Sequence, residues 1–139
     1  MKNFLILLIM ATASVTANAQ AKKAEKHRVV FQMSTADAQE QQGLIRNLNH
    51  LMEGWGDTFE AEVVAHGPGI SFVTNQSVVA GEVKKLAAKG IKFVACENTM
   101  KQKDIKHSDL LQGVGTVPMG LAEIVLKQEE GWAYIKGNF

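Results

Sequence analysis

Cys96 is the only cysteine of the 139-residue chain, and its position is the first sign of chemistry. It ends the apolar run in GIKFVACENTM, and the polar residues Asn98 and Thr99 follow closely. A thiolate is favoured where a strand gives way to a helix, because the free N–H groups of the first helical turn stabilise an anion. Free cysteine is also among the residue types most often buried in cores. The position leaves two interpretations open, a nucleophilic thiol or a small packed side chain.

His66 is the second residue that could do chemistry, at the end of the run FEAEVVAHG. It could orient a substrate or help to deprotonate a thiol, or it could simply hydrogen-bond to backbone. The glycines of HGPGI could present amides to a small anion, or they could form an ordinary glycine–proline turn. The candidate catalytic residues are Cys96 and His66, and the candidate substrate-binding residues are Gly67, Gly69, Asn98 and Thr99.

Stretches typical of strands alternate with stretches typical of helices along the chain after residue 27. Apolar and β-branched runs predict strands at 28–34, 59–67, 91–95, 114–117 and 132–137. Helical periodicity predicts helices that begin near residues 37, 77, 98 and 118, with a further short helix at 108–113. This order predicts an α/β fold, with a mostly parallel five-stranded sheet and helices on both of its faces.

Capping signals refine the starts of these helices. Asp37 and Glu40 have capping-box spacing, and Thr99 and Gln102 repeat it. Either Asn98 or Thr99 is expected to cap the helix after Cys96, and Pro118 fits the first turn of the last helix. The apolar residues expected to line that last helix are Leu121, Ala122, Ile124, Val125 and Leu126.

The carboxyl ends of the predicted strands should gather the chemistry-bearing residues at one edge. In an open parallel sheet, binding sites lie beyond these ends. The residues that follow the first four strands are Ser34 and Thr35; His66, Gly67 and Gly69; Cys96, Asn98 and Thr99; and 115–118. We therefore expect one thiol, one imidazole and several hydroxyls and glycines at the same rim.

The first 19 residues are expected to be a secretory signal peptide. Lys2 precedes a short apolar core, and Ala17-Asn18-Ala19 is a cleavage site of the A-x-A type. The apolar core is shorter than the roughly 20 residues of a membrane-spanning helix. We expect cleavage near Ala19, a polar leader at 20–27, a single domain at 28–139, a periplasmic location and no membrane anchor.

Composition excludes several other classes of function. The chain has 15 basic and 14 acidic residues, so removal of Lys2 with the signal peptide leaves a formally neutral protein. No broad basic field is present for nucleic acid. A single cysteine forms no internal disulfide. His66, Cys96 and His107 lack the close spacing of a zinc motif, and we expect no metal. Dinucleotide, P-loop and hydrolase motifs are absent.

Three segments resemble the DsrE/DsrF-like family, particularly its small YchN-type members. They are GIKFVAC, GVGTVPMGLAEI and GWAYIK, and the similarity extends over the expected mature chain, with HGPGI and CENTM as its most specific pieces. The resemblance implies a three-layer α/β/α domain that assembles into trimers or hexamers. It also implies that Cys96 matches the cysteine that carries sulfane sulfur as a persulfide in the sulfur-relay members. Those members work in the cytoplasm with dedicated partner subunits, whereas this chain carries an export signal.

Three functions follow as hypotheses. The first is a sulfur carrier that holds sulfane sulfur on Cys96, needs no bound cofactor and passes the sulfur to a partner thiol. The second is a non-catalytic oligomeric module that binds a small ligand at the strand ends, where Cys96 only packs. The third is a thiol redox sensor in which Cys96 is oxidised or pairs with a second protein. We rank the carrier first, mainly on the resemblance.

Overall fold

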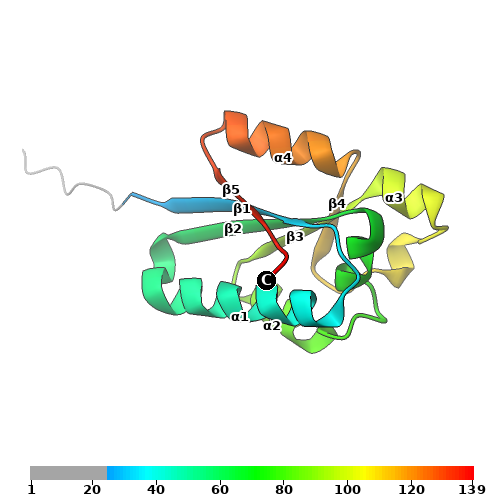
Figure 1. The fold of residues 1–139 in the computed structure, drawn as a ribbon, viewed down its shortest axis with the longest axis horizontal. Helices are drawn as coiled ribbons and strands as arrows, with labels where there is room; N and C mark the ends of the chain where they lie inside the picture. The colour runs from blue at the N-terminus through cyan, green and yellow to red at the C-terminus, as the bar shows by residue number, and fades with distance from the viewer. Residues whose placement is uncertain (1–24) are drawn as a thin grey trace, which may run out of the picture.

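A five-stranded parallel sheet forms the centre of the protein, in a computed structural model that describes residues 25–139 (Figure 1). Each strand pairs in parallel with its neighbours, in the order β4-β3-β2-β1-β5. The strands are β1 (His27–Met33), β2 (Phe59–Ala65), β3 (Lys92–Cys96), β4 (Val114–Val117) and β5 (Ala133–Lys136). The α/β prediction with a five-stranded sheet is confirmed, and the five strands fall where the sequence pattern places them.

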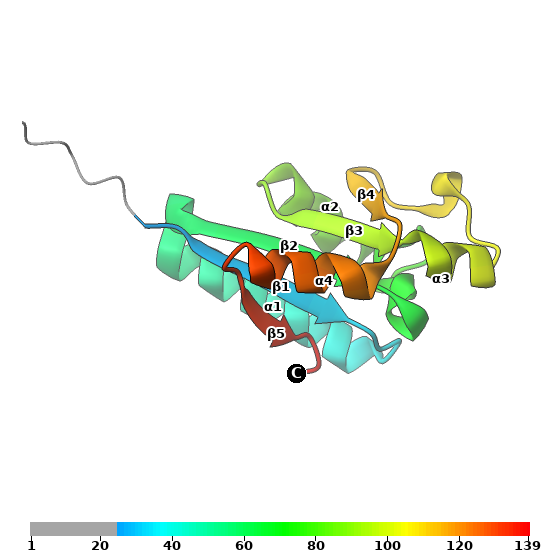
Figure 2. The same cartoon turned by 90° about the horizontal axis from the view of Figure 1, so that it is seen from above.

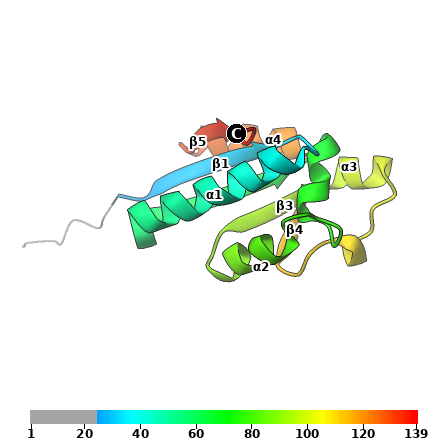
Figure 3. The same cartoon turned by 60° about the horizontal axis from the view of Figure 1, so that its bottom comes forward.

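One face of the sheet carries the larger core. It is covered by helices α1 (Ala38–Trp55) and α2 (Ala80–Ala88) and by the 3₁₀ segment η2 (Gly67–Val73) (Figure 3). Asp37 caps α1 as predicted, because its Oδ1 accepts hydrogen bonds from the N–H groups of Gln39 and Glu40, each at 2.9 Å. Glu40 does not complete the capping box, since the Asp37 N–H donates to Thr35 Oγ1 instead.

The other face is covered mainly by the single helix α4 (Gly120–Glu129), as Figure 2 shows from above. The short helix α3 (Glu97–Gln102) lies beyond the end of β3 (Figure 1). Only Gly120 and Ile124 of α4 are buried. The expected apolar lining is therefore wrong for Leu121, Ala122, Val125 and Leu126, which are exposed. Because one helix covers this face, its small core contains Val30, Val64, Val94, Val117, Ile124 and Trp132.

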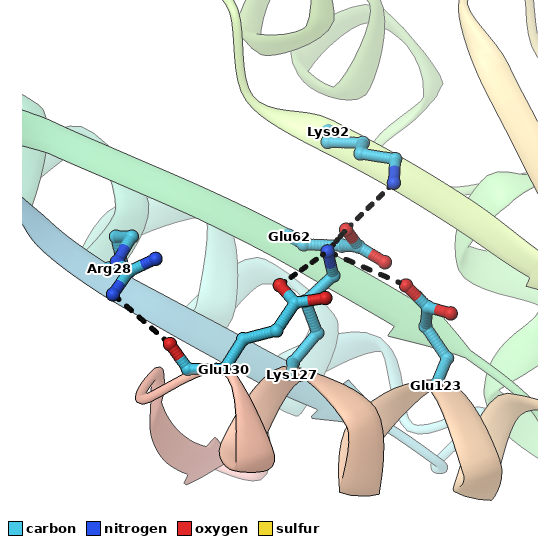
Figure 4. A network of polar contacts seen from close by, with 6 residues as sticks. All are labelled: Arg28, Glu62, Lys92, Glu123, Lys127 and Glu130. Atoms are coloured by element: carbon cyan, nitrogen blue, oxygen red, sulfur yellow. Dashed lines mark hydrogen bonds and ion pairs between the residues drawn. The ribbon is translucent and has the colours of Figure 1, made fainter.

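Ion pairs hold α4 against the sheet (Figure 4). The fully buried Glu62 of β2 lies 2.9 Å from Lys92 Nζ of β3 and 3.6 Å from Lys127 Nζ of α4. Lys127 also pairs with Glu123 and Glu130 within its own helix. Burial raises the pKa of Glu62 and Glu123 raises it further, whereas Lys92 opposes both. This network fixes the middle and end of α4, and so orients its first turn over the ends of β2 and β3.

Several predicted helix boundaries differ from the structure. Helix α3 begins at Glu97 with Cys96 itself as N-cap, so Asn98 and Thr99 lie inside the helix and neither caps it. Extended pairing of β3 continues through Cys96 and leaves no room for a later cap. The expected helix at 108–113 is only a 3₁₀ turn, η3 (His107–Asp109). Pro118 precedes α4 by two residues instead of lying in its first turn.

The expectations about export fall mostly outside the described residues. The signal peptide at 1–19, its cleavage near Ala19 and residues 20–24 of the expected leader all belong to that part of the chain. Of the remaining leader residues, His27 already belongs to β1. Within residues 25–139, none of the helices has both the length and the apolar character needed to cross a membrane.

Candidate functional site

The register of the sheet brings His66 and Cys96 to neighbouring positions at its carboxyl edge. Ala65 at the end of β2 pairs with Ala95 of β3, so the residues that follow them, His66 and Cys96, lie at the same level of the sheet. His66 lies two positions after Val64, and Cys96 lies two positions after Val94. These two valines belong to the core beneath α4. Because side chains alternate along a strand, His66 and Cys96 are placed toward the α4 face.

Gly120, the first residue of α4, closes this edge. A Cβ atom at position 120 would lie 3.2 Å from the Cβ atoms of both Cys96 and His66, and equally close to Val64. Only a glycine allows the start of the helix to approach the two strand ends so closely. Gly120 is not recognisable from sequence as part of the site, since a glycine has no reactive side chain and this one lies 24 positions after Cys96.

The Cys96 thiol accepts a hydrogen bond from the backbone of α4. The Gly120 N–H lies 3.2 Å from Cys96 Sγ. Burial raises the pKa of the Cys96 thiol, but hydrogen bonds from the amides of Gly120, Thr99 and Asn98 and from the Thr99 hydroxyl lower it by more. The net result is a thiol pKa below its ordinary value. Two helix starts, those of α3 and α4, therefore stabilise charge on one sulfur.

Cys96 is nevertheless buried, with only 5% of its surface exposed. A thiolate that reacts with an external donor needs access as well as ionisation. The sulfur atom is aimed at backbone amides, which distinguishes it from a cysteine that only fills an apolar gap. The geometry therefore combines a tuned thiol with a cover formed by the first turn of α4.

His66 is the end of a chain of side-chain hydrogen bonds that runs from β5 through β1 to the residue after β2. Its Nε2 lies 2.9 Å from Gln32 Nε2 of β1, and the Tyr134 hydroxyl of β5 donates to Gln32 Oε1. Burial lowers the pKa of His66. Gln32 and Tyr134 were not predicted as site residues. The one available signal was a polar residue, Gln32, inside the apolar run RVVFQM.

The amides of the HGPGI loop are used within the protein. The Gly67 N–H donates to Thr99 Oγ1 at 3.0 Å, and the Gly69 N–H donates to the His66 carbonyl at 3.0 Å. Gly69 is buried against the end of β1. Thr99 is buried beside Cys96, whereas Asn98 is exposed and its N–H lies 3.3 Å from the Pro118 carbonyl. The four candidate binding residues, Gly67, Gly69, Asn98 and Thr99, therefore make contacts within the protein that hold the loops around the thiol in place.

The other histidines lie away from this rim. His50 is exposed on α1, and His107 lines a surface cavity of about 460 Å³ together with Glu97, Met100, Lys101, Asp104 and Ile105. In the described part of the chain, no group of three or more His, Cys, Asp or Glu residues is arranged to hold a metal ion.

One family model matches the chain, and several solved structures share its fold. The model of the DsrE/DsrF-like family matches residues 26–136. A protein of unknown function from Methanobacterium thermoautotrophicum is 37% identical, with a TM-score of 0.77 over 80% of this chain and 99% of that one. None of the curated proteins matches the chain.

Two more distant structures share the fold. A conserved protein of unknown function from Bacteroides thetaiotaomicron is 16% identical, with a TM-score of 0.63 over 79% of this chain and 94% of its own. The YchN protein of E. coli is 11% identical, with a TM-score of 0.58 over 81% of this chain and 98% of its own.

Proposed function

The chain belongs to the DsrE/DsrF-like family, and on that premise we propose that it is a periplasmic sulfur carrier. The family is associated in general with sulfur relay. In this proposal Cys96 holds a sulfane sulfur as a persulfide and passes it to a partner thiol. The protein needs no bound cofactor, because sulfur itself is the cargo.

The hydrogen bond from the Gly120 N–H to Cys96 Sγ is the observation that best supports this role. A carrier thiol must be a thiolate to attack a sulfane sulfur, and backbone amides favour that form without a neighbouring base. The amides are fixed by α3 and α4, so they require no rearrangement when the charge appears.

The loading step is a thiol exchange. The Cys96 thiolate attacks the outer sulfur of a donor persulfide, a new S–S bond forms on Cys96, and the donor's S–S bond breaks. The donor leaves as a thiolate with the electron pair of the broken bond. Release is the same reaction in reverse, with an acceptor thiolate attacking the outer sulfur of Cys96–S–SH. No external oxidant or reductant is consumed.

Sulfur loading should be visible in the intact mass. After treatment with polysulfide and removal of excess reagent, we expect the protein to gain the mass of one sulfur atom, and we expect Cys96→Ser to gain none. A low-molecular-weight thiol should then remove the added sulfur. In exported protein, the same spectrum should show a chain that starts near Gln20, because the A-x-A site precedes it.

An unchanged mass would contradict the carrier role. Together with slow alkylation that becomes fast only on unfolding, it would favour the ligand-binding module, which the burial of Cys96 would also suit. A covalent dimer on a non-reducing gel after mild peroxide, without sulfur uptake, would favour the redox sensor.

We also propose that α4 packs against further copies of this chain in a trimer or hexamer. Leu121 and Val125 are 57% and 53% exposed, and Met119, Leu126 and Tyr134 are exposed nearby. Apolar side chains gathered on one helix are typical of an interface. We expect sedimentation of the wild type to show an oligomer and Leu121→Glu to shift it toward the monomer. Val78→Glu is the matched control, since Val78 is 61% exposed away from α4. A monomeric wild type would contradict this proposal.

A further inference from the structure

Three side chains on the α4 face of the sheet form a hydrogen-bonded chain that ends on His66. Tyr134 of β5 donates its hydroxyl hydrogen to Gln32 Oε1, and Gln32 Nε2 lies 2.9 Å from His66 Nε2. Gln32 and His66 are partly buried; Tyr134 belongs to β5, Gln32 belongs to β1, and His66 directly follows β2. The arrangement is therefore built by the pairing of β5, β1 and β2 and not by local sequence.

The direction of these hydrogen bonds determines where His66 carries its proton. An amide nitrogen donates and does not accept, so a ring nitrogen that faces Gln32 Nε2 must be the acceptor. His66 Nε2 is then unprotonated, and a neutral imidazole must carry its proton on Nδ1. In this arrangement the Tyr134 hydroxyl donates to the oxygen end of the Gln32 amide, and the nitrogen end faces His66.

We propose that Gln32 is a positioning residue, which holds His66 as a neutral imidazole that is protonated on Nδ1 and has its Nε2 lone pair occupied. The relevance of this tautomer to sulfur chemistry depends on the proposed function of Cys96, although the tautomer itself does not. In this state neither ring nitrogen has a free lone pair, so His66 does not remove the Cys96 proton. Ionisation of Cys96 then relies on the amides around it.

Burial agrees with a neutral His66, because it lowers the pKa of that imidazole. The ionisable groups on this face include Cys96 and Lys92 of β3, Tyr134 and Lys136 of β5, Arg28 of β1, Glu62 of β2, and Glu123, Lys127 and Glu130 of or next to α4. Glu62 and Glu123 are both engaged by Lys127. Within residues 25–139, the side chain of His66 bonds to Gln32 and to no carboxylate, which is consistent with an uncharged ring.

The tautomer can be read directly by nitrogen NMR of the full exported protein at neutral pH. The signals of His66 are identified as those missing from the spectrum of His66→Asn. We expect them to report a pyridine-like Nε2 and a pyrrole-like Nδ1. The exposed His50 is the internal reference, and its signals should report an ordinary solvated ring. A pyrrole-like Nε2 on His66 in the wild type would overturn the proposal.

Two substitutions of Gln32 test its part. In Gln32→Glu the new carboxylate only accepts, so we expect the proton to move to His66 Nε2 and the His66 titration to shift to higher pH. An imidazolium beside Cys96 should also shift the alkylation midpoint of the thiol to lower pH by about one unit. In Gln32→Met no partner remains, and we expect both tautomers together. An unchanged His66 spectrum in either folded variant would contradict a positioning role.

Failure of this inference is distinguishable from failure of the carrier proposal. The NMR signature involves no sulfur, so it can hold in a protein that never gains mass with polysulfide. Conversely, a wild type that loads sulfur with a pyrrole-like His66 Nε2 would keep the carrier role and reject the assignment to Gln32.

Discussion

Replacing Gly120 with valine should raise the midpoint of Cys96 alkylation by about one to two pH units. The side chain would overlap Cys96, His66 and Val64, which lie 3.2 Å from the Cβ position. The start of α4 must then move away, and the hydrogen bond from its first N–H to Sγ is lost. A hydrogen bond to a charged group contributes roughly 1.5–3 kcal/mol, which corresponds to about one to two pKa units.

The measurement is the rate of alkylation against pH in the folded protein, with circular dichroism to confirm folding. Gly120→Ala should give a smaller shift, because one methyl group needs a displacement of only a few tenths of an ångström. Gly81→Val is the matched control, since Gly81 lies in the first turn of α2 with open space around it. A folded Gly120→Val protein with the wild-type midpoint would show that α4 does not tune the thiol.

Replacing Gly69 with alanine should destabilise the protein strongly. A Cβ atom there would fall 2.3 Å from the Met33 carbonyl oxygen and 2.7 Å from the Ser34 nitrogen. These are backbone atoms at the end of a central strand, and no rotamer change relieves the overlap. Overpacking costs about 1–3 kcal/mol and more where the backbone must shift, so we expect about 3 kcal/mol or more. For a domain of this size, that lowers Tm by roughly 10 °C.

Thermal and urea unfolding followed by circular dichroism measure this effect. Gly54→Ala is the control, because Gly54 is exposed in α1 with no atom within 4 Å of its Cβ position. Alanine is the better helix former by about 1 kcal/mol, so this control should match or exceed the wild type. Equal stability of Gly69→Ala and Gly54→Ala would contradict the close approach of η2 to the end of β1.

The sequence predicts the fold well because its information is local. Apolar runs of strand length and helical stripes identify the elements, and their alternation requires a parallel sheet. The rule for strand ends then brings His66 and Cys96 together without any knowledge of distance. Helix starts are less predictable: Asn98 and Thr99 are good caps by residue type, but pairing of β3 with β4 extends the strand through Cys96 and sets the start of α3.

The remaining parts of the site depend on contacts between distant segments. Gly120 meets Cys96 only because ion pairs from Lys127 and the small core under α4 fix that helix across the sheet. Gln32 and Tyr134 are 102 positions apart and meet only because β5 pairs with β1. The exposed side of α4 was also unpredictable, since an apolar stripe does not reveal whether this chain or another copy covers it.

The hydrogen bond between the first amide of α4 and Cys96 couples ionisation of the thiol to the packing of α4 against the sheet. The coupling free energy is the same in both directions: a thiolate stabilises the packed position of α4 by as much as that packed position stabilises the thiolate. A neutral sulfur would hold the helix less firmly. A change in the ionisation or modification of Cys96 can therefore alter how α4 packs, and with it the exposed face of that helix.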